Sequence, residues 1–244
     1  MSFSSLEHTN APDVFTASPE YDKRFLGEVG AYFLSVQKQA VLSHLSRLTS
    51  GPVSILEVGG GHLQITRDLV ARGHSVTVHG STEEALDKLN SSEMASKVGQ
   101  LVAPINEINK TAKRCDIVIA LRLLPHVVDE AELLDKLVRL SKKGLVFDFA
   151  STRGLNSLSS LAFYFKKKIE KNTRPYFNHS PAAIKNLLES HQCKDIQFTG
   201  QFVFPMGIHR ALKNVTVSKL IEGGARPFRD LWGNPIICGT KTDG

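Results

Sequence analysis

The residues best placed for chemistry lie in a short run in which an acid is followed by three glycines. Glu57 stands just before the turn at residues 59–61. The apolar run from Val53 predicts a strand before the turn, and residues 64–72 predict a helix after it that Gly73 ends. Such a turn brings bare backbone N–H groups and a helix N-terminus close to a ligand. A carboxylate beside them favours a ligand with a positive head group, such as an ammonium or a sulfonium.

The glycine turn does not fit a dinucleotide. The dinucleotide fingerprint would place its third glycine at Gln64, and the residue two before the first glycine would be apolar instead of Glu57. The sequence therefore favours another adenosine-bearing cofactor over NAD.

Two further residues are candidates for proton transfer at the same edge of the predicted sheet. His126 follows the fourth predicted strand, and histidine is the natural base near neutral pH. Asp148 ends the fifth strand, where a side chain can point toward the ligand crevice. The alternatives are a loop histidine that only packs or caps the next helix, and an acid that only bonds to neighbouring backbone.

The elements that must position these residues alternate between strands and helices. A helix is predicted from Tyr21 through residue 48, and Ser81 or Thr82 can cap the helix after the second strand. Asp129 begins another helix, which Gly144 is expected to end. The alternation predicts an α/β fold, a Rossmann-like doubly wound sheet. The predicted strands after the first are residues 75–79, 97–103, 115–121, 145–149, 195–204 and 235–240.

Composition is ordinary for a globular protein. The chain has 244 residues, 41% apolar and 22% charged, and no apolar run near the roughly 20 residues that a membrane span needs. We expect a mobile leader over residues 1–20, then a single domain with lid segments at residues 151–180 and 205–233. The three cysteines read as buried thiols of a cytoplasmic protein, with no metal site. A net charge of +6 favours anionic partners without identifying them.

The run Leu56-Glu57-Val58-Gly59-Gly60-Gly61 resembles motif I of the class I S-adenosylmethionine-dependent methyltransferases. Residues 116–126 resemble the fourth strand of that family and the loop after it, and residues 142–144 resemble the turn before its fifth strand. The segment from Tyr176 to Pro181 resembles the entry into the helix before strand six. The resemblance covers residues 21–241 and implies a seven-stranded sheet, mostly parallel, with an antiparallel last strand.

The resemblance implies S-adenosylmethionine (SAM) as the cofactor. It places Glu57 and the glycines Gly59, Gly60 and Gly61 around the methionine end of SAM, and it implies further cofactor contacts at Leu121, Arg122, Tyr21 and Arg24.

Two positions depart from the family pattern. Leu63 stands where the third glycine is expected, and Gly80 stands where an acid normally accepts the ribose hydroxyls, with Ser81 next to it. Losing those charged hydrogen bonds costs about 1.5 to 3 kcal/mol unless Ser81 or Glu83 substitutes.

The predicted lids supply the candidate substrate residues. Tyr164, Arg174 and Tyr176 could clamp an acidic or aromatic acceptor, and His209 overhangs the site from the second lid. The alternative is a solvated basic helix face with core aromatics and a structural histidine. We therefore expect methyl transfer to a small molecule, at oxygen in preference to nitrogen, and no nucleic-acid or membrane partner. A catalytically silent module of this fold and an RNA methyltransferase are the competing hypotheses.

Overall fold

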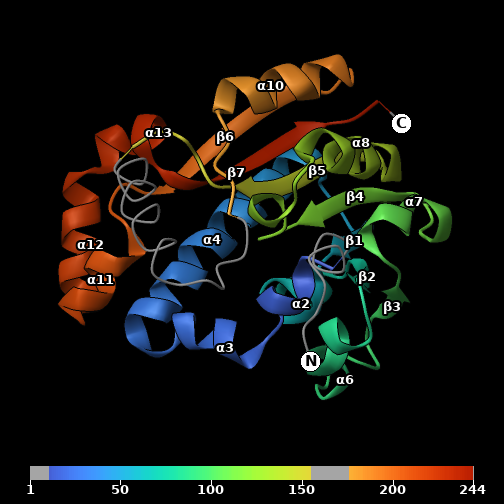
Figure 1. Cartoon of the computed structure of the whole chain (residues 1–244), viewed down its shortest axis with the longest axis horizontal. Coiled ribbons are helices and arrows are strands. Elements are labelled where there is room, and N and C mark those ends of the chain that lie inside the picture. Colours follow the sequence, from blue (N-terminus) through green and yellow to red (C-terminus); the bar gives the residue numbers. More distant parts are fainter. Residues whose placement is uncertain (1–10, 155–175, 244) are drawn as a thin grey trace.

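The computed structural model describes residues 11–154 and 176–243, and a seven-stranded sheet forms its centre (Figure 1). The strand order is β3-β2-β1-β4-β5-β7-β6. β7 runs antiparallel to both of its neighbours, and the remaining neighbours pair in parallel. The predicted doubly wound sheet with an antiparallel last strand is confirmed. The strands are β1 (Ser54–Val58), β2 (Ser75–Gly80), β3 (Gly99–Val102), β4 (Cys115–Ala120), β5 (Ser141–Phe149), β6 (Lys194–Phe202) and β7 (Asn234–Lys241).

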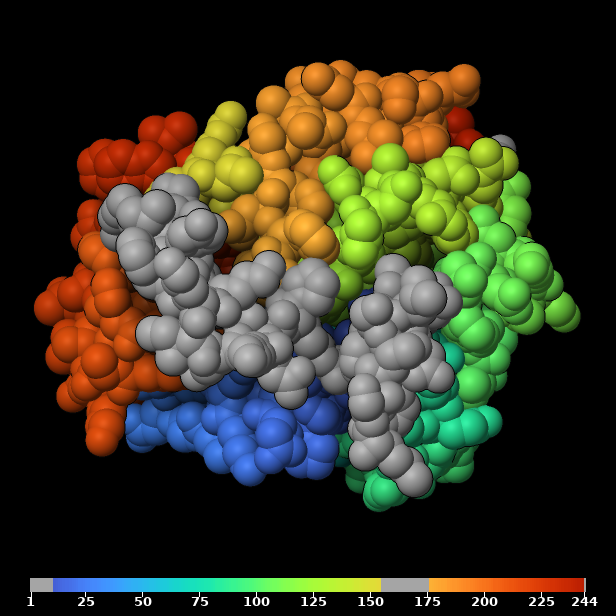
Figure 2. All heavy atoms as spheres, viewed as in Figure 1, coloured from blue at the N-terminus to red at the C-terminus, as the bar shows by residue number. Residues whose placement is uncertain are grey.

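Helices cover both faces of the sheet. One apolar cluster joins α4 (Gly27–Leu48), α5 (Thr66–Ala71) and α6 (Asp87–Asn90) to the sheet. A second cluster covers the other face with α7 (Ile108–Thr111), α8 (Glu130–Leu140) and α10 (Pro181–Ser190). Figure 2 shows α8 and α10 side by side on the surface. Because both faces are buried, β4 and the second half of β5 consist mainly of apolar residues.

The N-terminal segment is folded where the sequence predicted a leader. From Ala11 onward the chain forms α2 (Asp13–Thr16), α3 (Pro19–Asp22) and η1 (Lys23–Phe25), and residues 1–10 lie outside the described part. Asp13, Thr16 and Tyr21 are buried. Short polar stretches carry little periodicity, so their docking on the domain was not visible in the sequence.

Between β6 and β7 the chain builds a helical unit at one edge of the sheet. It contains α11 (Met206–Leu212), α12 (Val215–Gly224), η6 (Arg226–Phe228) and α13 (Arg229–Trp232). Glu222 anchors the unit because its carboxylate accepts the backbone N–H groups of Val203 and Phe204 at 3.0 Å.

Among the described residues, no helix is both long and apolar enough to cross a membrane.

Two predictions that rest on neighbouring residues, a helix start and buried cysteines, were confirmed. The Asp129 side chain accepts the backbone N–H of Glu132, as the capping pattern predicted, and all three cysteines are buried and unpaired. The expected end of that helix at Gly144 was wrong. The helix ends at Leu140, and Gly144 lies inside β5, where a Cβ atom would come within 2.7 Å of the Leu48 side chain. Glycine is therefore needed there for close helix packing.

Asp116 ties the beginnings of three strands together, and this predicts an acid-sensitive stabilisation. Its carboxylate accepts the backbone N–H and the hydroxyl of Ser54 in β1 at 2.9 and 2.8 Å, and forms an ion pair with Lys143 in β5 at 2.9 Å. Together these interactions lower the pKa of Asp116 to about 2, and the hydrogen bond from the Ser54 backbone has the largest effect. The stabilisation is therefore complete above pH 4 and disappears as the pH falls through about 2.

We expect Asp116→Asn to lower the free energy of unfolding by about 2 kcal/mol at pH 7, with the difference vanishing near pH 2. Urea unfolding at several pH values measures it. Asp230→Asn on an exposed turn of α13 is the matched control. An equal loss at pH 7 and pH 2 would contradict the assignment.

Candidate functional site

The glycine turn after β1 adopts the backbone that a close ligand approach requires. Gly59 has a φ of +67°, residues Gly60–His62 form a short 3-10 turn (η2), and Leu63 has a φ of +59°. Leu63 thus retains a left-handed backbone at the position where the family pattern has a glycine. This conformation costs a leucine about 1 kcal/mol, and burial of its side chain in the core offsets that cost.

Glu57 is a buried carboxylate placed against this turn. A Cβ atom at Gly60 would lie 2.6 Å from the Glu57 side chain, so glycine leaves the space that the carboxylate occupies. The Thr66 hydroxyl donates to one carboxylate oxygen at 2.7 Å, while the other oxygen is buried without a partner. Burial raises the pKa of Glu57 to about 8. A cation arriving beside it would stabilise the ionised form.

Arg122, Asp148 and Gln37 form a buried network at the ends of β4 and β5. The backbone N–H of Arg122 donates to one Asp148 oxygen, and the Gln37 amide donates to the other at 3.0 Å. The Arg122 guanidinium donates to the Gln37 carbonyl at 3.0 Å, and its Nη1 is buried without a partner. Burial raises the pKa of Asp148 to about 6. The sequence predicted Arg122 and Asp148 here, but not Gln37.

Aromatic rings surround the open side of this network. The Arg122 guanidinium lies 4.0 Å from the ring centre of Phe25, and that of Arg24 lies 4.8 Å from the ring centre of Tyr21. The structure thus brings together Tyr21, Arg24 and Arg122, which the sequence predicted as cofactor contacts. The guanidinium groups favour an anionic ligand group.

His126 and Tyr176, predicted as catalytic and substrate residues, are neighbours. His126 ends the short turn η5 (Leu124–His126), and its ring centre lies 5.6 Å from that of Tyr176 and 6.3 Å from that of Phe15 in α2. The backbone N–H of Phe177 donates to the Pro125 carbonyl at 2.9 Å, which fixes residues after 175 beside η5. His126 is half-buried.

The loop after β2 packs directly on the glycine turn. A Cβ atom at Gly61 would lie 1.7 Å from the carbonyl oxygen of Ala85 in η3 (Glu84–Leu86), so the two backbones touch. An ion pair between Lys88 and Asp22, at 2.6 Å, closes the loop against α3.

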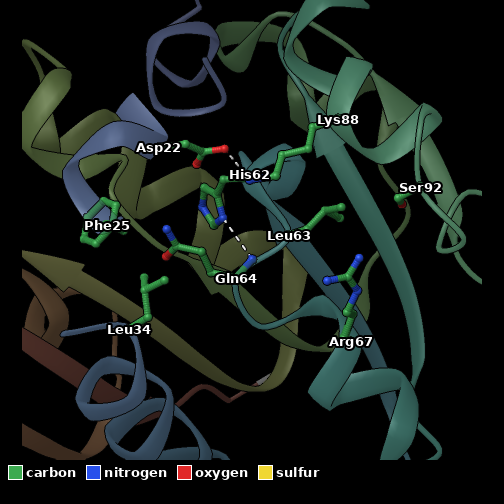
Figure 3. Close-up of a pocket in the computed structure, with 9 residues that line it drawn as sticks. All are labelled: Asp22, Phe25, Leu34, His62, Leu63, Gln64, Arg67, Lys88 and Ser92. Atoms are coloured by element: carbon green, nitrogen blue, oxygen red, sulfur yellow. Dashed lines mark hydrogen bonds and ion pairs between the residues drawn. The ribbon is translucent and has the colours of Figure 1, made fainter. Parts of the chain in front are cut away.

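A cavity of about 260 Å³ lies beside the turn, around His62 (Figure 3). Burial lowers the pKa of His62 to about 3, so its ring is neutral. The cavity is smaller than the roughly 300 to 1,000 Å³ typical of ligand pockets. The cavity is lined by Asp22, Phe25, Leu34, His62, Leu63, Gln64, Arg67, Lys88 and Ser92.

The other residues that the sequence predicted for the site lie in several parts of the structure. Leu121 is buried directly after β4, Gly80 is the last residue of β2, and Ser81 follows it. His209 is fully buried in α11, where its Nε2 lies 3.1 Å from Glu222, so this geometry supports a structural role and its substrate contact stays a prediction. Tyr164 and Arg174 lie outside the described residues.

Three buried polar residues at this edge were not predicted. Gln37 is a polar residue at helical spacing between the buried Phe33 and Ala40, and that spacing could have revealed it. His79 accepts the backbone N–H of Gly59 at its Nδ1, and its Nε2 therefore donates to the Ala103 carbonyl at 2.8 Å. The third residue, Asp13, carried no sequence signal, because it lies in a polar stretch without periodicity.

Buried polar atoms without partners gather at this edge of the sheet, and they fit an adenosine-bearing amino-acid cofactor. A free carboxylate oxygen suits an ammonium or a sulfonium, a free guanidinium nitrogen suits a carboxylate, and a free carboxylate and hydroxyl suit ribose hydroxyls. These atoms are Glu57 Oε1, Arg122 Nη1, Asp13 Oδ1 and Ser81 Oγ.

Comparisons with known proteins identify the fold. No family model matches the chain, and the search of curated proteins found no match. Among solved structures, a magnesium protoporphyrin IX methyltransferase from Synechocystis with bound SAM has a TM-score of 0.62 at 14% identity, over 99% of this chain and 100% of that chain. A SAM-dependent methyltransferase from Archaeoglobus fulgidus has a TM-score of 0.58 at 16% identity, over 91% and 98% of the two chains.

A plantazolicin methyltransferase, solved with a triazolic desmethylPZN analogue and SAH, has a TM-score of 0.60 at 15% identity, over 98% of this chain and 96% of that chain. These likenesses show that the chain has the fold of the class I SAM-dependent methyltransferases.

The contact between Gly61 and Ala85 predicts an effect of a single methyl group. We expect Gly61→Ala to lower the free energy of unfolding by more than 2 kcal/mol, because the added Cβ forces the loop after β2 off the glycine turn. Thermal unfolding measures the loss, and limited proteolysis reports exposure of residues 81–92. Gly51→Ala is the matched control, since a Cβ there meets nothing within 4 Å. Equal stability of the two variants would contradict the close approach.

Proposed function

We propose that this protein transfers a methyl group from SAM to a small-molecule acceptor. The observation that carries the proposal is the set of buried, unpartnered polar atoms around the glycine turn on a methyltransferase fold. When bound, SAM supplies an electrophilic methyl group on a positively charged sulfur.

The residues present would hold the two charged ends of SAM differently. Glu57, with one free oxygen, would bind a positive group of SAM, and Arg122, with one free nitrogen, would bind its carboxylate. Asp148 uses both of its oxygens to hold Arg122 and Gln37, so we assign it the orientation of Arg122.

The acceptor side is assigned to His126 and Tyr176. A half-buried histidine with its ring next to Tyr176 and Phe15 can take a proton from a hydroxyl or amine held on those rings. The aromatic surroundings favour a planar acceptor, and we propose oxygen in preference to nitrogen as the methylated atom. The names of two of the methyltransferases described above each contain a compound, which is magnesium protoporphyrin IX in one and plantazolicin in the other.

A catalytically silent module is the second candidate. It is favoured by Gly80 at the end of β2 and by the contact of the loop after β2 with Gly61. Binding of SAM and transfer of its methyl group are therefore tested separately.

We expect the wild-type protein to bind SAM in a calorimetric titration, and Glu57→Gln to weaken binding about tenfold or more, because a charged hydrogen bond is lost. Binding should strengthen as the pH rises through about 8, because a cation favours the ionised form of Glu57. Glu189→Gln, exposed on α10, is the matched control. No binding at millimolar SAM would overturn the proposal.

The same variant has an opposite effect on the ligand-free protein. Since the pKa of Glu57 is raised from 4.5 to about 8, the wild type loses stability as the pH rises through that range. We expect Glu57→Gln to be more stable than wild type at pH 9, by up to about 4 kcal/mol. The unfolding midpoints of wild type and Glu57→Gln should converge near pH 4.

With an acceptor found by screening planar phenols and amines against isotopically labelled SAM, we expect His126→Asn to lower kcat about 100-fold or more. SAM affinity should stay unchanged, because His126 lies on the acceptor side. His191→Asn, on the surface after α10, is the matched control. Binding without transfer to any acceptor would favour the silent module, and unchanged kcat in His126→Asn would exclude His126 as the base.

A further inference from the structure

Asp13 is a buried carboxylate that forms no ion pair with any described residue. It is 1% exposed and lies in α2, far in sequence from the strands that it touches. Its Oδ2 accepts the backbone N–H of Ser81 at 2.8 Å, and its Oδ1 is buried without a partner. A buried carboxylate satisfied by one neutral donor is costly, so a further donor is expected from a ligand.

The position of Asp13 is between the ends of β1 and β2. A Cβ atom at Gly59 would lie 3.2 Å from the Asp13 Cβ, so the side chain lies directly over the glycine turn. The Ser81 hydroxyl, also buried and unpartnered, belongs to the residue whose N–H the carboxylate accepts. Two unpartnered oxygens on contacting residues, one of them charged, suit a ligand that presents hydroxyl groups.

The end of β2 itself has no room for an acid. A Cβ atom at Gly80 would come within 2.7 Å of Leu86, which is fully buried. A longer side chain at position 80 would displace that leucine from the core. The carboxylate that reaches the residue after β2 is that of Asp13, which comes from α2.

We propose that Asp13 supplies, from the N-terminal segment, the acceptor for the ribose hydroxyls of the cofactor, with Ser81 beside it. This proposal rests on the proposed function, because it assigns a contact within the SAM site. Asp13 Oδ1 has no hydrogen-bond partner and can accept a ribose hydroxyl. Because a carboxylate oxygen has two lone pairs, Oδ2 can accept a second hydrogen bond beside the one from the Ser81 N–H.

The test compares two ligands that differ only in the ribose. The full chain is titrated by calorimetry with S-adenosylhomocysteine and with its 2′,3′-dideoxyribose analogue. We expect wild type to prefer the ribose form about tenfold or more, because a site built for hydroxyls rejects a ligand that lacks them. Asp13→Ala should bind both forms within about threefold of each other.

Three further variants separate recognition from folding. Asp13→Asn keeps an acceptor for the Ser81 N–H and should fold as wild type while losing most of the preference. Asp13→Ala combined with Ser81→Asp supplies a carboxylate from the neighbouring residue and should restore part of the preference. Glu20→Gln, exposed in α3, should keep the full preference. Unfolding midpoints without ligand verify that each variant folds.

The outcomes distinguish the two proposals. Failure of wild type to bind S-adenosylhomocysteine overturns both. Binding without ribose preference, or a preference that survives in Asp13→Asn and Asp13→Ala, overturns only the assignment of Asp13. An equal gain in affinity for both ligands in Asp13→Ala would show that Asp13 blocks the site, and it would also overturn the assignment.

Discussion

The Asp148 carboxylate accepts the backbone N–H of Arg122 and the side-chain amide of Gln37, and this buried network orders the edge of the sheet where the candidate site lies. It joins β5 to the loop after β4 and to α4. Each carboxylate oxygen has a donor, which offsets the cost of burying the acid. Arg122, held in a left-handed backbone conformation with φ of +60°, is thereby pointed toward Phe25 and Tyr21.

A second set of contacts closes the other half of the site. Asp13 bonds to Ser81, Asp22 pairs with Lys88, and Ala85 touches Gly61, so α2, α3 and the loop after β2 are held together over the glycine turn. The first contact is buried, whereas the Asp22–Lys88 pair is partly exposed and therefore weak. The loop after β2 also carries Leu86 and Leu89, which are fully buried in the core, so core packing holds it in this closed arrangement.

The sequence predicted the residues whose signal is local. Alternating apolar runs and glycine turns gave the strands, Asp129 marked its helix, and motif I placed Glu57 and the glycines at the end of β1. The helix boundary at Gly144 was wrong because glycine there serves close packing against Leu48 instead of ending a helix. Nothing local distinguishes those two uses of glycine.

By itself, then, the sequence determined the α/β fold, the glycine turn and the acid beside it, because periodicity and turn chemistry are properties of neighbouring residues. Only the tertiary structure decided which distant side chains meet there. Gln37 comes from α4, Asp13 comes from a polar stretch expected to be a leader, and His209 is drawn into a buried pair with Glu222. Each of these placements depends on packing between segments far apart in the chain. Burial also set the pKa values of Glu57 and Asp148, since desolvation exists only in the folded protein.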